Sequence, residues 1–357
     1  MFLAINELIK EKLRFILIIA VIALVSYLTF FLTALAYGLA TSYTQGIEKW
    51  SASGIVLQKD ANDNVARSLL TQADYREVLG DDTALLGVGN ATIEVDANKE
   101  DVAIFGIEQG SFLNPNITEG RGVERADEVV VSDELQRIGV VLGQTLVFKG
   151  GESTYNVVGF TDRATFQTAP IVYMQIESWR IAASELAGMR GMKDDTTVSA
   201  IVTIGTVDAG RFATDTMQWQ TITDFSFKLP GYNAQVLTFS TMIGFLIVIA
   251  SFVLAIFMYI LTLQKKSMFG VLKAEGVPNK YIARSVKTQI VILSVVGMAI
   301  GLAFTLITGI ALADKVPFMV QPFFFIAIVA LFLLCAAIGG IASVWAVTKI
   351  DPVEAIG

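Results

Sequence analysis

The chain has 357 residues, of which 54% are hydrophobic and only 17% are charged, and its mean hydropathy is +0.61. This composition is too apolar for an ordinary soluble domain and predicts membrane-spanning segments. The sequence contains no histidine, which excludes His-based zinc sites and Ser-His-Asp triads, and the net charge of -7 argues against nucleic acid as a partner. One cysteine cannot form an intramolecular disulfide.

The first 14 residues, MFLAINELIKEKLR, place apolar side chains on one side of a helix. We expect a cytoplasmic amphipathic helix at 1–14 that lies along the membrane, and a plain extension of the first span is an equal alternative. Four uncharged segments are long enough to cross the hydrocarbon core, and they predict TM1 to TM4 at 15–40, 236–263, 288–313 and 322–347. Within the third segment, Gly297 and Gly301 form a G-x-x-x-G pattern, which favours packing within one subunit and dimerisation equally.

Residues 41–235 have the pattern of a water-soluble α+β domain. Eight short segments show alternation or β-branched enrichment and predict strands: GIVLQ, ATIEVD, DVAIFGI, EVVVS, QTLVFK, TYNVVGF, IVYM and SAIVTI. Helices are expected at 71–79, 132–138, 176–185 and 209–221. A division into two lobes would place a loop-rich boundary near 186–196.

Charge predicts the orientation. The termini and the loop at 264–287 carry ten basic and five acidic residues, whereas 41–235 carries 27 acidic and 15 basic residues. Short basic flanks resist translocation, so we expect both termini, the loop at 264–287 and the tail at 348–357 on the cytoplasmic side of a bacterial cell membrane. The domain at 41–235 is then extracytoplasmic.

The residue pattern of the cytoplasmic loop at 264–287 predicts a segment that docks onto a soluble protein. Met268, Val271 and Leu272 share one face of a short helix, and Gly276 with Pro278 predicts a turn before the next helix. A simple connector needs no such apolar face, so we interpret these five residues as the segment that couples the membrane helices to a partner.

Two segments carry a family resemblance. FGVLKAEGVPNKYIARSVKTQIVIL resembles the G-x-L-K/R-A-x-G signature of FtsX-like and MacB-like permeases, and KIDPVEAIG is similar to their P-x-E-A-I/L ending. The resemblance covers the whole chain, and RFILIIAVIALVSYLTFFLTALAYGLA, IVLQKDAND, VVVSDEL, PGYNAQ and IDPVEAIG look most like HrtB-type haem-efflux permeases. It implies the type VII ABC transporter architecture, with four transmembrane helices and an inserted α+β domain.

The resemblance further implies a homodimer, with TM1 and TM2 at its interface, paired with two copies of an ABC-type ATPase. The sequence holds no G-x-x-x-x-G-K-S/T phosphate loop, so we expect a non-catalytic permease without an intrinsic cofactor, and ATP hydrolysis in the partner.

If haem is the cargo, as the resemblance implies for haem efflux and detoxification, a site between outer-leaflet helix ends would take it from the membrane. The candidates are Tyr43 and Glu48 beyond TM1, and Tyr232 and Met242 at the outer end of TM2. Haem-permease relatives carry a tyrosine around the segment TFQTAP, where this chain has Phe166; phenylalanine cannot ligate iron, and stacking on the cargo stays open. Each residue has a structural alternative, such as an aromatic belt or core packing. We expect no metal site beyond ligation of the haem iron.

Two other functions remain open at this point. The same machinery could export a lipid, a lipoprotein or an antimicrobial peptide, or an FtsX-like mechanotransmitter could activate a cell-wall hydrolase. Paired acidic residues, namely 81–82, 127–128 and 194–195, are interpreted as solvated surface rather than as a catalytic site.

Overall fold

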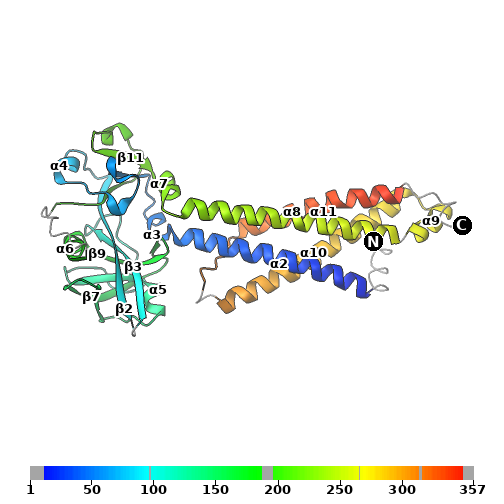
Figure 1. The fold of residues 1–357 in the computed structure, drawn as a ribbon, viewed down its shortest axis with the longest axis horizontal. Coiled ribbons are helices and arrows are strands. Elements are labelled where there is room, and N and C mark those ends of the chain that lie inside the picture. The colour runs from blue at the N-terminus through cyan, green and yellow to red at the C-terminus, as the bar shows by residue number, and fades with distance from the viewer. Residues whose placement is uncertain (1–11, 96–97, 187–195, 265, 313–315, 349–357) are drawn as a thin grey trace. The chain divides into compact units, whose positions relative to one another are not determined.

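The computed structural model describes residues 12–95, 98–186, 196–264, 266–312 and 316–348 (Figure 1). The chain forms two compact units, a helical unit (residues 1–38 and 237–357) and an inserted domain (residues 39–236). The amphipathic helix expected at 1–14 and the tail at 348–357 fall almost entirely outside the described residues. Helical membrane segments flank a mixed β-sheet domain, which confirms the predicted fold class.

The long helices are α2 (Lys12–Ser42), α8 (Tyr232–Gln264), α10 (Asn279–Leu312) and α11 (Pro322–Thr348). Among the described residues, α2, α8 and α10 are long and apolar enough to span a membrane, and the apolar part of α11, Pro322–Ile338, is shorter. The short α9 (Lys266–Ala274) lies between α8 and α10.

Close contact between α2 and α10 depends on two glycines of α10. A Cβ on Gly301 would lie 2.4 Å from Ser26 Oγ, and a Cβ on Gly297 would lie 2.6 Å from a methyl carbon of Ile22. The hydroxyl of Ser26 donates to the Ile22 carbonyl at 2.6 Å, which satisfies it within its own helix. The G-x-x-x-G pattern therefore serves packing within one subunit.

The inserted domain is built on one sheet of eleven strands. The strands are β1 (Gly54–Gln58), β2 (Thr83–Val95), β3 (Asn98–Ile107), β4 (Glu119–Gly120), β5 (Glu128–Ser132), β6 (Thr145–Val147), β7 (Thr154–Thr161), β8 (Thr165–Phe166), β9 (Ala169–Gln175), β10 (Ala200–Thr203) and β11 (Met217–Thr221). Their order is β11-β1-β10-β2-β3-β9-β5-β7-β4, with β6 paired to β7 and β8 to β9. The β3–β9 and β5–β7 pairs are parallel and the others are antiparallel. The domain's helices are α3 (Gln45–Glu48), α4 (Gln72–Tyr75), α5 (Asp133–Arg137), α6 (Ile176–Leu186) and α7 (Ile222–Lys228).

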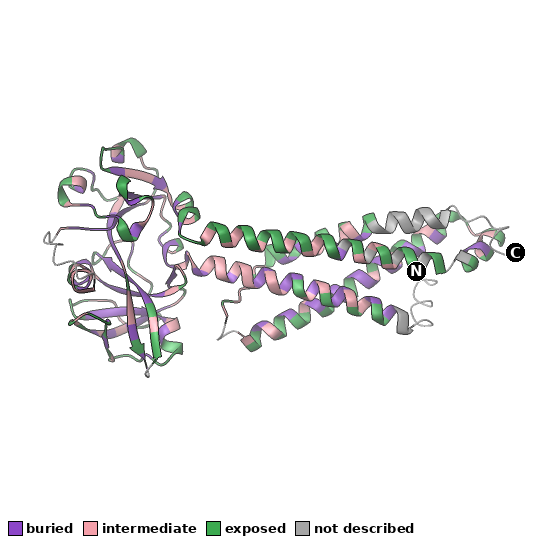
Figure 2. Ribbon diagram, viewed as in Figure 1, coloured by how far each residue is buried: buried purple, intermediate pink, exposed green. Residues whose placement is uncertain are grey.

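Both faces of this sheet are covered by apolar side chains. Successive residues of a strand point to opposite faces, so Val102 and Ile104 of β3 enter one core and Ala103 and Phe105 enter the other. Trp179 of α6 belongs to the first of these cores. Figure 2 shows the result as buried strands at the centre of the domain.

Two expectations about this domain are wrong. Residues 209–221 form a single 3-10 turn (Ala209–Phe212) followed by β11 rather than one helix, because β11 pairs with β1 along its whole length. The described strands also form one sheet rather than two lobes, and the expected boundary falls mostly on residues outside the described part.

Candidate functional site

Two of the residues predicted to meet cargo come together within the inserted domain, near its two ends in the chain. Tyr43 follows the end of α2, and Tyr232 is the first residue of α8. Their rings lie 5.6 Å apart between centroids at an interplanar angle of 58°, and Phe227 of α7 packs against Tyr232 at 5.7 Å. We call Tyr43, Phe227 and Tyr232 the aromatic cluster.

Backbone contacts position Tyr43 in this cluster. Two amides of the turn between β8 and β9 donate hydrogen bonds to this segment. The Gln167 amide donates to the Tyr43 carbonyl at 3.0 Å, and the Thr168 amide donates to the Ser42 carbonyl at 3.2 Å. These bonds satisfy carbonyls at the end of α2 that have no helical partner. Gly231, directly before α8, has φ +84°, a backbone angle that favours glycine. A Cβ there would also lie only 3.3 Å from the Tyr43 hydroxyl.

Glu48 ends α3 and presents an exposed carboxylate close to the cluster. It accepts a hydrogen bond from the Thr44 hydroxyl at 2.6 Å and forms no ion pair among the described residues. The neighbouring Lys49 is engaged elsewhere, with its ammonium 3.1 Å from Asp162 Oδ1. Glu48 is near enough to act electrostatically on the Tyr232 phenol. The aromatic cluster therefore offers aromatic faces and two phenol oxygens, and beside it lies the Glu48 carboxylate, which no lysine or arginine of the described residues neutralises.

Two other predicted cargo residues lie elsewhere. Phe166 is buried in the domain core, with its ring 5.3 Å from that of Phe105, so its face is covered by protein in the described structure. Its segment still contributes, because the following turn binds the end of α2. Met242 lies on α8, ten residues after Tyr232, with an exposed side chain in the helical unit.

The predicted coupling segment forms α9 and the turn after it. The Gly276 amide donates to the Lys273 carbonyl and the Val277 amide to the Leu272 carbonyl, both at 3.0 Å, and Gly276 has φ +88°. This is the glycine-terminated end that stops a helix. The carbonyl of Pro278 then accepts from the Tyr281 amide at the start of α10.

Burial divides the expected docking face of α9. Met268 and Val271 are exposed by 38% and 43%, whereas Leu272 is half-buried against the core of its own helical unit. Phe269 is only 2% exposed in that core and was missed by sequence reasoning, although its spacing of three residues from Leu272 indicated a shared helix face. The free surface of α9 is therefore smaller than expected.

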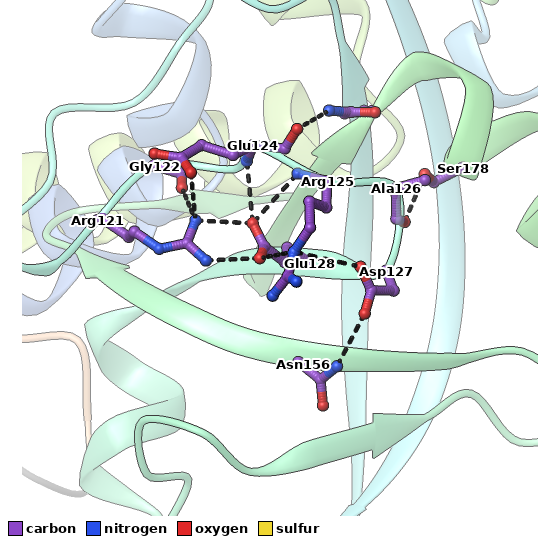
Figure 3. Close-up of polar contacts among 10 residues, drawn as sticks. Arg121, Gly122, Glu124, Arg125, Ala126, Asp127, Glu128, Asn156 and Ser178 are labelled. Carbon is purple, nitrogen blue, oxygen red and sulfur yellow. Dashed lines mark hydrogen bonds and ion pairs between the residues drawn. The ribbon is translucent and has the colours of Figure 1, made fainter.

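A buried carboxylate overturns the surface interpretation of one acidic pair. The Glu128 side chain has no exposed area, and its oxygens accept from Arg121 at 2.7 and 2.5 Å and from Arg125 Nε at 2.7 Å (Figure 3). The amides of Glu124 and Arg125 also donate to it. The Arg121 guanidinium, helped by the other donors and opposed by burial, holds the pKa of Glu128 far below its usual range. With every acceptor engaged, Glu128 fixes the loop before β5 rather than forming a reactive site.

The acidic pair at 81–82, which lies within the described residues, provides no reactive site either. Asp82 pairs with Arg211 at 2.8 Å, and residues 194–195 lie outside the described part of the chain. Within the described residues, no group of three or more Cys, Asp or Glu side chains is placed to hold a metal ion.

Comparison with known proteins gives matches to membrane permeases. Residues 240–352 match the family model "FtsX-like permease C-terminal". The chain is 27% identical over 361 residues to a "Putative hemin transport system permease protein HrtB" of Staphylococcus epidermidis, and 24% identical over 363 residues to the protein of the same name in Staphylococcus haemolyticus, with 99% of each chain covered in both cases. An uncharacterized ABC transporter permease of Mycobacterium tuberculosis is 24% identical over 366 residues, which cover 100% of this chain and 99% of the relative.

Among solved structures, the chain is similar to the extracellular domain of the noncanonic ABC-type transporter YknZ from Gram-positive bacteria. The TM-score is 0.33 at 13% identity, with 48% of this chain and 100% of that chain covered.

Proposed function

Because this chain belongs to the FtsX-like permease family, matched over residues 240–352, we propose that it is the membrane subunit of an ATP-driven ABC exporter. The family expected from the 264–287 loop and the C-terminal ending is thereby confirmed. In this proposal the subunit is not an enzyme, and a separate ATPase supplies the energy.

The surface of α9 supports docking of that ATPase. Met268 and Val271 are exposed on a helix that Phe269 anchors to the helical unit, so a partner that moves α9 also moves the core around Phe269. Exposed apolar residues beside a fixed anchor suit an amphipathic helix that enters a groove. We propose a homodimer with two ATPase copies, with α9 and both termini in the cytoplasm and the inserted domain outside.

We propose haem as the cargo. The proposal rests on full-length similarity to the two Staphylococcus proteins named as hemin transport permeases. The aromatic cluster supports it, because haem is a flat and largely apolar molecule, and tyrosine oxygen is an established ligand type for haem iron. The uncompensated Glu48 carboxylate would repel the haem propionates and so direct them away from the cluster.

The test uses the chain together with its ATPase in lipid nanodiscs, with hemin added. We expect hemin to shift the Soret band and to change ATP turnover, and we expect Tyr43→Phe and Tyr232→Phe to weaken the Soret shift. Tyr281→Phe is the matched control, because that phenol is exposed on α10 outside the cluster. A Soret band and a turnover that both ignore hemin would remove haem from the proposal and leave the ABC permease intact.

A mechanotransmitter is the second candidate, and helix continuity favours it. The helices α2 and α8 run without a break for 31 and 33 residues, and each passes from the helical unit into the inserted domain. Stiff helices can transmit motion without moving cargo. A cell-wall hydrolase retained by the full chain, together with unchanged haem sensitivity in a deletion strain, would favour this function. Competition of hemin by lipids or amphipathic peptides would instead identify another cargo.

A further inference from the structure

A pocket of about 400 Å³ lies in the inserted domain, between the sheet and α6. Its walls come from β2 and β3, from α6, from Ser199 just before β10 and from the segment that contains the 3-10 turn Val65–Arg67. Most lining side chains are apolar or small, among them Leu69, Ile104, Ala183 and Leu186. The size falls within the range of pockets that bind small molecules.

Glycines in two adjacent strands make room for the indole that forms one wall. A Cβ on Gly87 or Gly106 would lie 2.2 or 2.4 Å from Trp179, so only glycine allows the ring to lie this close to the sheet. The Trp179 nitrogen lies beside Gly89, which lines the same pocket. A Cβ added at Gly89 would lie 3.4 Å from that nitrogen. This buried N–H has no hydrogen-bond acceptor among the described residues.

Two exposed polar side chains of the pocket, those of Arg67 and Asn90, have no partner among the described residues. Among the described residues, Arg67 is the one charged residue of the lining, and neither its guanidinium nor the amide of Asn90 forms a hydrogen bond or ion pair with any of them. Ser199, the other polar residue of the lining, is already paired, since its hydroxyl accepts from the Val88 amide at 2.9 Å. An apolar pocket with one cation and neutral donors complements a ligand with one negative charge and an apolar body.

We propose that this pocket binds a small apolar carboxylate, with its carboxylate at Arg67 and Asn90 and its apolar body against Trp179 and Ala183. The guanidinium matches a carboxylate in shape and charge and forms paired hydrogen bonds with it. A dianionic phosphate ester would leave one charge uncompensated beside apolar walls. This site lies outside the aromatic cluster, and it does not depend on haem being the cargo.

The experiment measures equilibrium dialysis of 2-naphthoate against the full chain in lipid nanodiscs, with nanodiscs without protein as the blank. We expect saturable binding of one molecule per chain. Arg67→Gln should weaken binding at least tenfold, and the neutral analogue 2-naphthalenemethanol should bind at least tenfold more weakly than 2-naphthoate. The matched control is Arg76→Gln, which removes the same charge from an exposed arginine outside the pocket lining and should leave binding unchanged.

A second variant tests the cavity itself. Ala183→Leu places three more carbon atoms in the pocket and should abolish binding while the tryptophan fluorescence of the folded domain persists. Absence of saturable binding to the unaltered chain would overturn the proposal. So would binding that survives both Arg67→Gln and Ala183→Leu, because the ligand would then lie elsewhere.

Discussion

The inserted domain and the helical unit bury their apolar side chains to different degrees. The domain covers both faces of its sheet with continuous cores, whereas only 6% of the apolar window of α8 is buried, against 39% for α2 and for α10. Water penalises exposed apolar area in the domain, but lipid tails are as apolar as leucine and impose no such penalty on α8. Exposure on α8 is therefore compatible with stability and leaves its surface for lipid or for the expected second copy.

The two units also treat polar groups differently. In the helical unit, hydroxyls such as those of Ser26 and Thr29 donate to carbonyls of their own helix, which satisfies these polar groups without an ion pair. The domain instead places a whole carboxylate, Glu128, under two arginines. Hydrogen bonds within one helix suit the membrane interior, which offers no donors or acceptors. The exposed charges of an ionic cluster, in contrast, need hydration by water.

Replacement of Glu128 should give the largest loss of stability in the domain. Glu128→Ala leaves Arg121, Arg125 and two backbone amides without their acceptor, and because the arginines remain hydrated we expect a loss of about 2–3 kcal/mol. Denaturant unfolding of the full chain, followed by tryptophan fluorescence, measures it, since three of the four tryptophans (Trp50, Trp179 and Trp219) lie in the domain. Glu124→Gln is the control with an exposed carboxylate, and an equal loss there would refute the special role of Glu128.

Close helix packing should be the most sensitive feature of the helical unit. Gly301→Val pushes a side chain against Ser26 and should cost about 1–3 kcal/mol, without changing the fluorescence unfolding of the domain. The single cysteine, Cys335 of α11, is half-buried, and we expect faster reaction with a thiol reagent in this variant. Gly244→Val is the control, because nothing lies within 4 Å of a Cβ at that position. Equal labelling rates in the two variants would contradict the packing inferred for α2 and α10.

Local patterns predicted much of the domain. All eight predicted strand segments contain or overlap observed strands, because β-branched residues and alternation reflect the same burial that the sheet provides. The helix expected at 209–221 failed where pairing with β1 overrode a weak local preference. The strand order was not predictable, since it depends on contacts between distant segments.

Only those residues of the candidate site that lie next to the ends of the long helices in the chain could be predicted from the sequence. Tyr43 and Tyr232 lie near the two ends of the inserted domain in the chain, at the end of α2 and the start of α8, and the domain brings them together. Phe227 was not predicted because nothing in its mixed polar and apolar segment indicates the contact with Tyr232, whereas Phe269 was overlooked although its spacing from Leu272 indicated a shared helix face. The role of Glu128 was not predictable either, because Arg121 and Arg125 contact its carboxylate only once the loop before β5 has folded.

The loss of coupling should be smaller than the stability losses expected for Glu128→Ala and Gly301→Val, but it should be confined to one surface. Replacement of Met268 and Val271 together by Asp should lower hemin-dependent ATP turnover about tenfold, equivalent to about 1.4 kcal/mol, because the docking surface becomes charged. Cys335 labelling should stay unchanged, since neither side chain enters the core. Phe269→Asp is the contrasting variant and should raise labelling as well. Full turnover in the double variant would exclude α9 as the docking helix.

The smallest effect is expected from mild acid, and it should appear in the domain alone. Arg121 lowers the pKa of Glu128 from its ordinary value of 4.5, and the hydrogen bond from Lys49 likewise lowers the pKa of Asp162 from 3.8. A carboxylate with a depressed folded pKa contributes stability that is present above its unfolded pKa and is lost as the pH falls toward the folded value.

Unfolding free energy should therefore change little between pH 7 and pH 5 and fall below about pH 4.5. Burial raises the pKa of Glu134, which opposes this trend, so the informative quantity is the difference between the unaltered chain and Glu128→Gln. Denaturant unfolding at pH 7, 5 and 4 measures that difference, which should shrink at pH 4 because protonation of Glu128 in the unfolded chain removes its advantage. A difference that grows as the pH falls would mean that the buried carboxylate destabilises the fold, and the contrast between the two units would then need another cause.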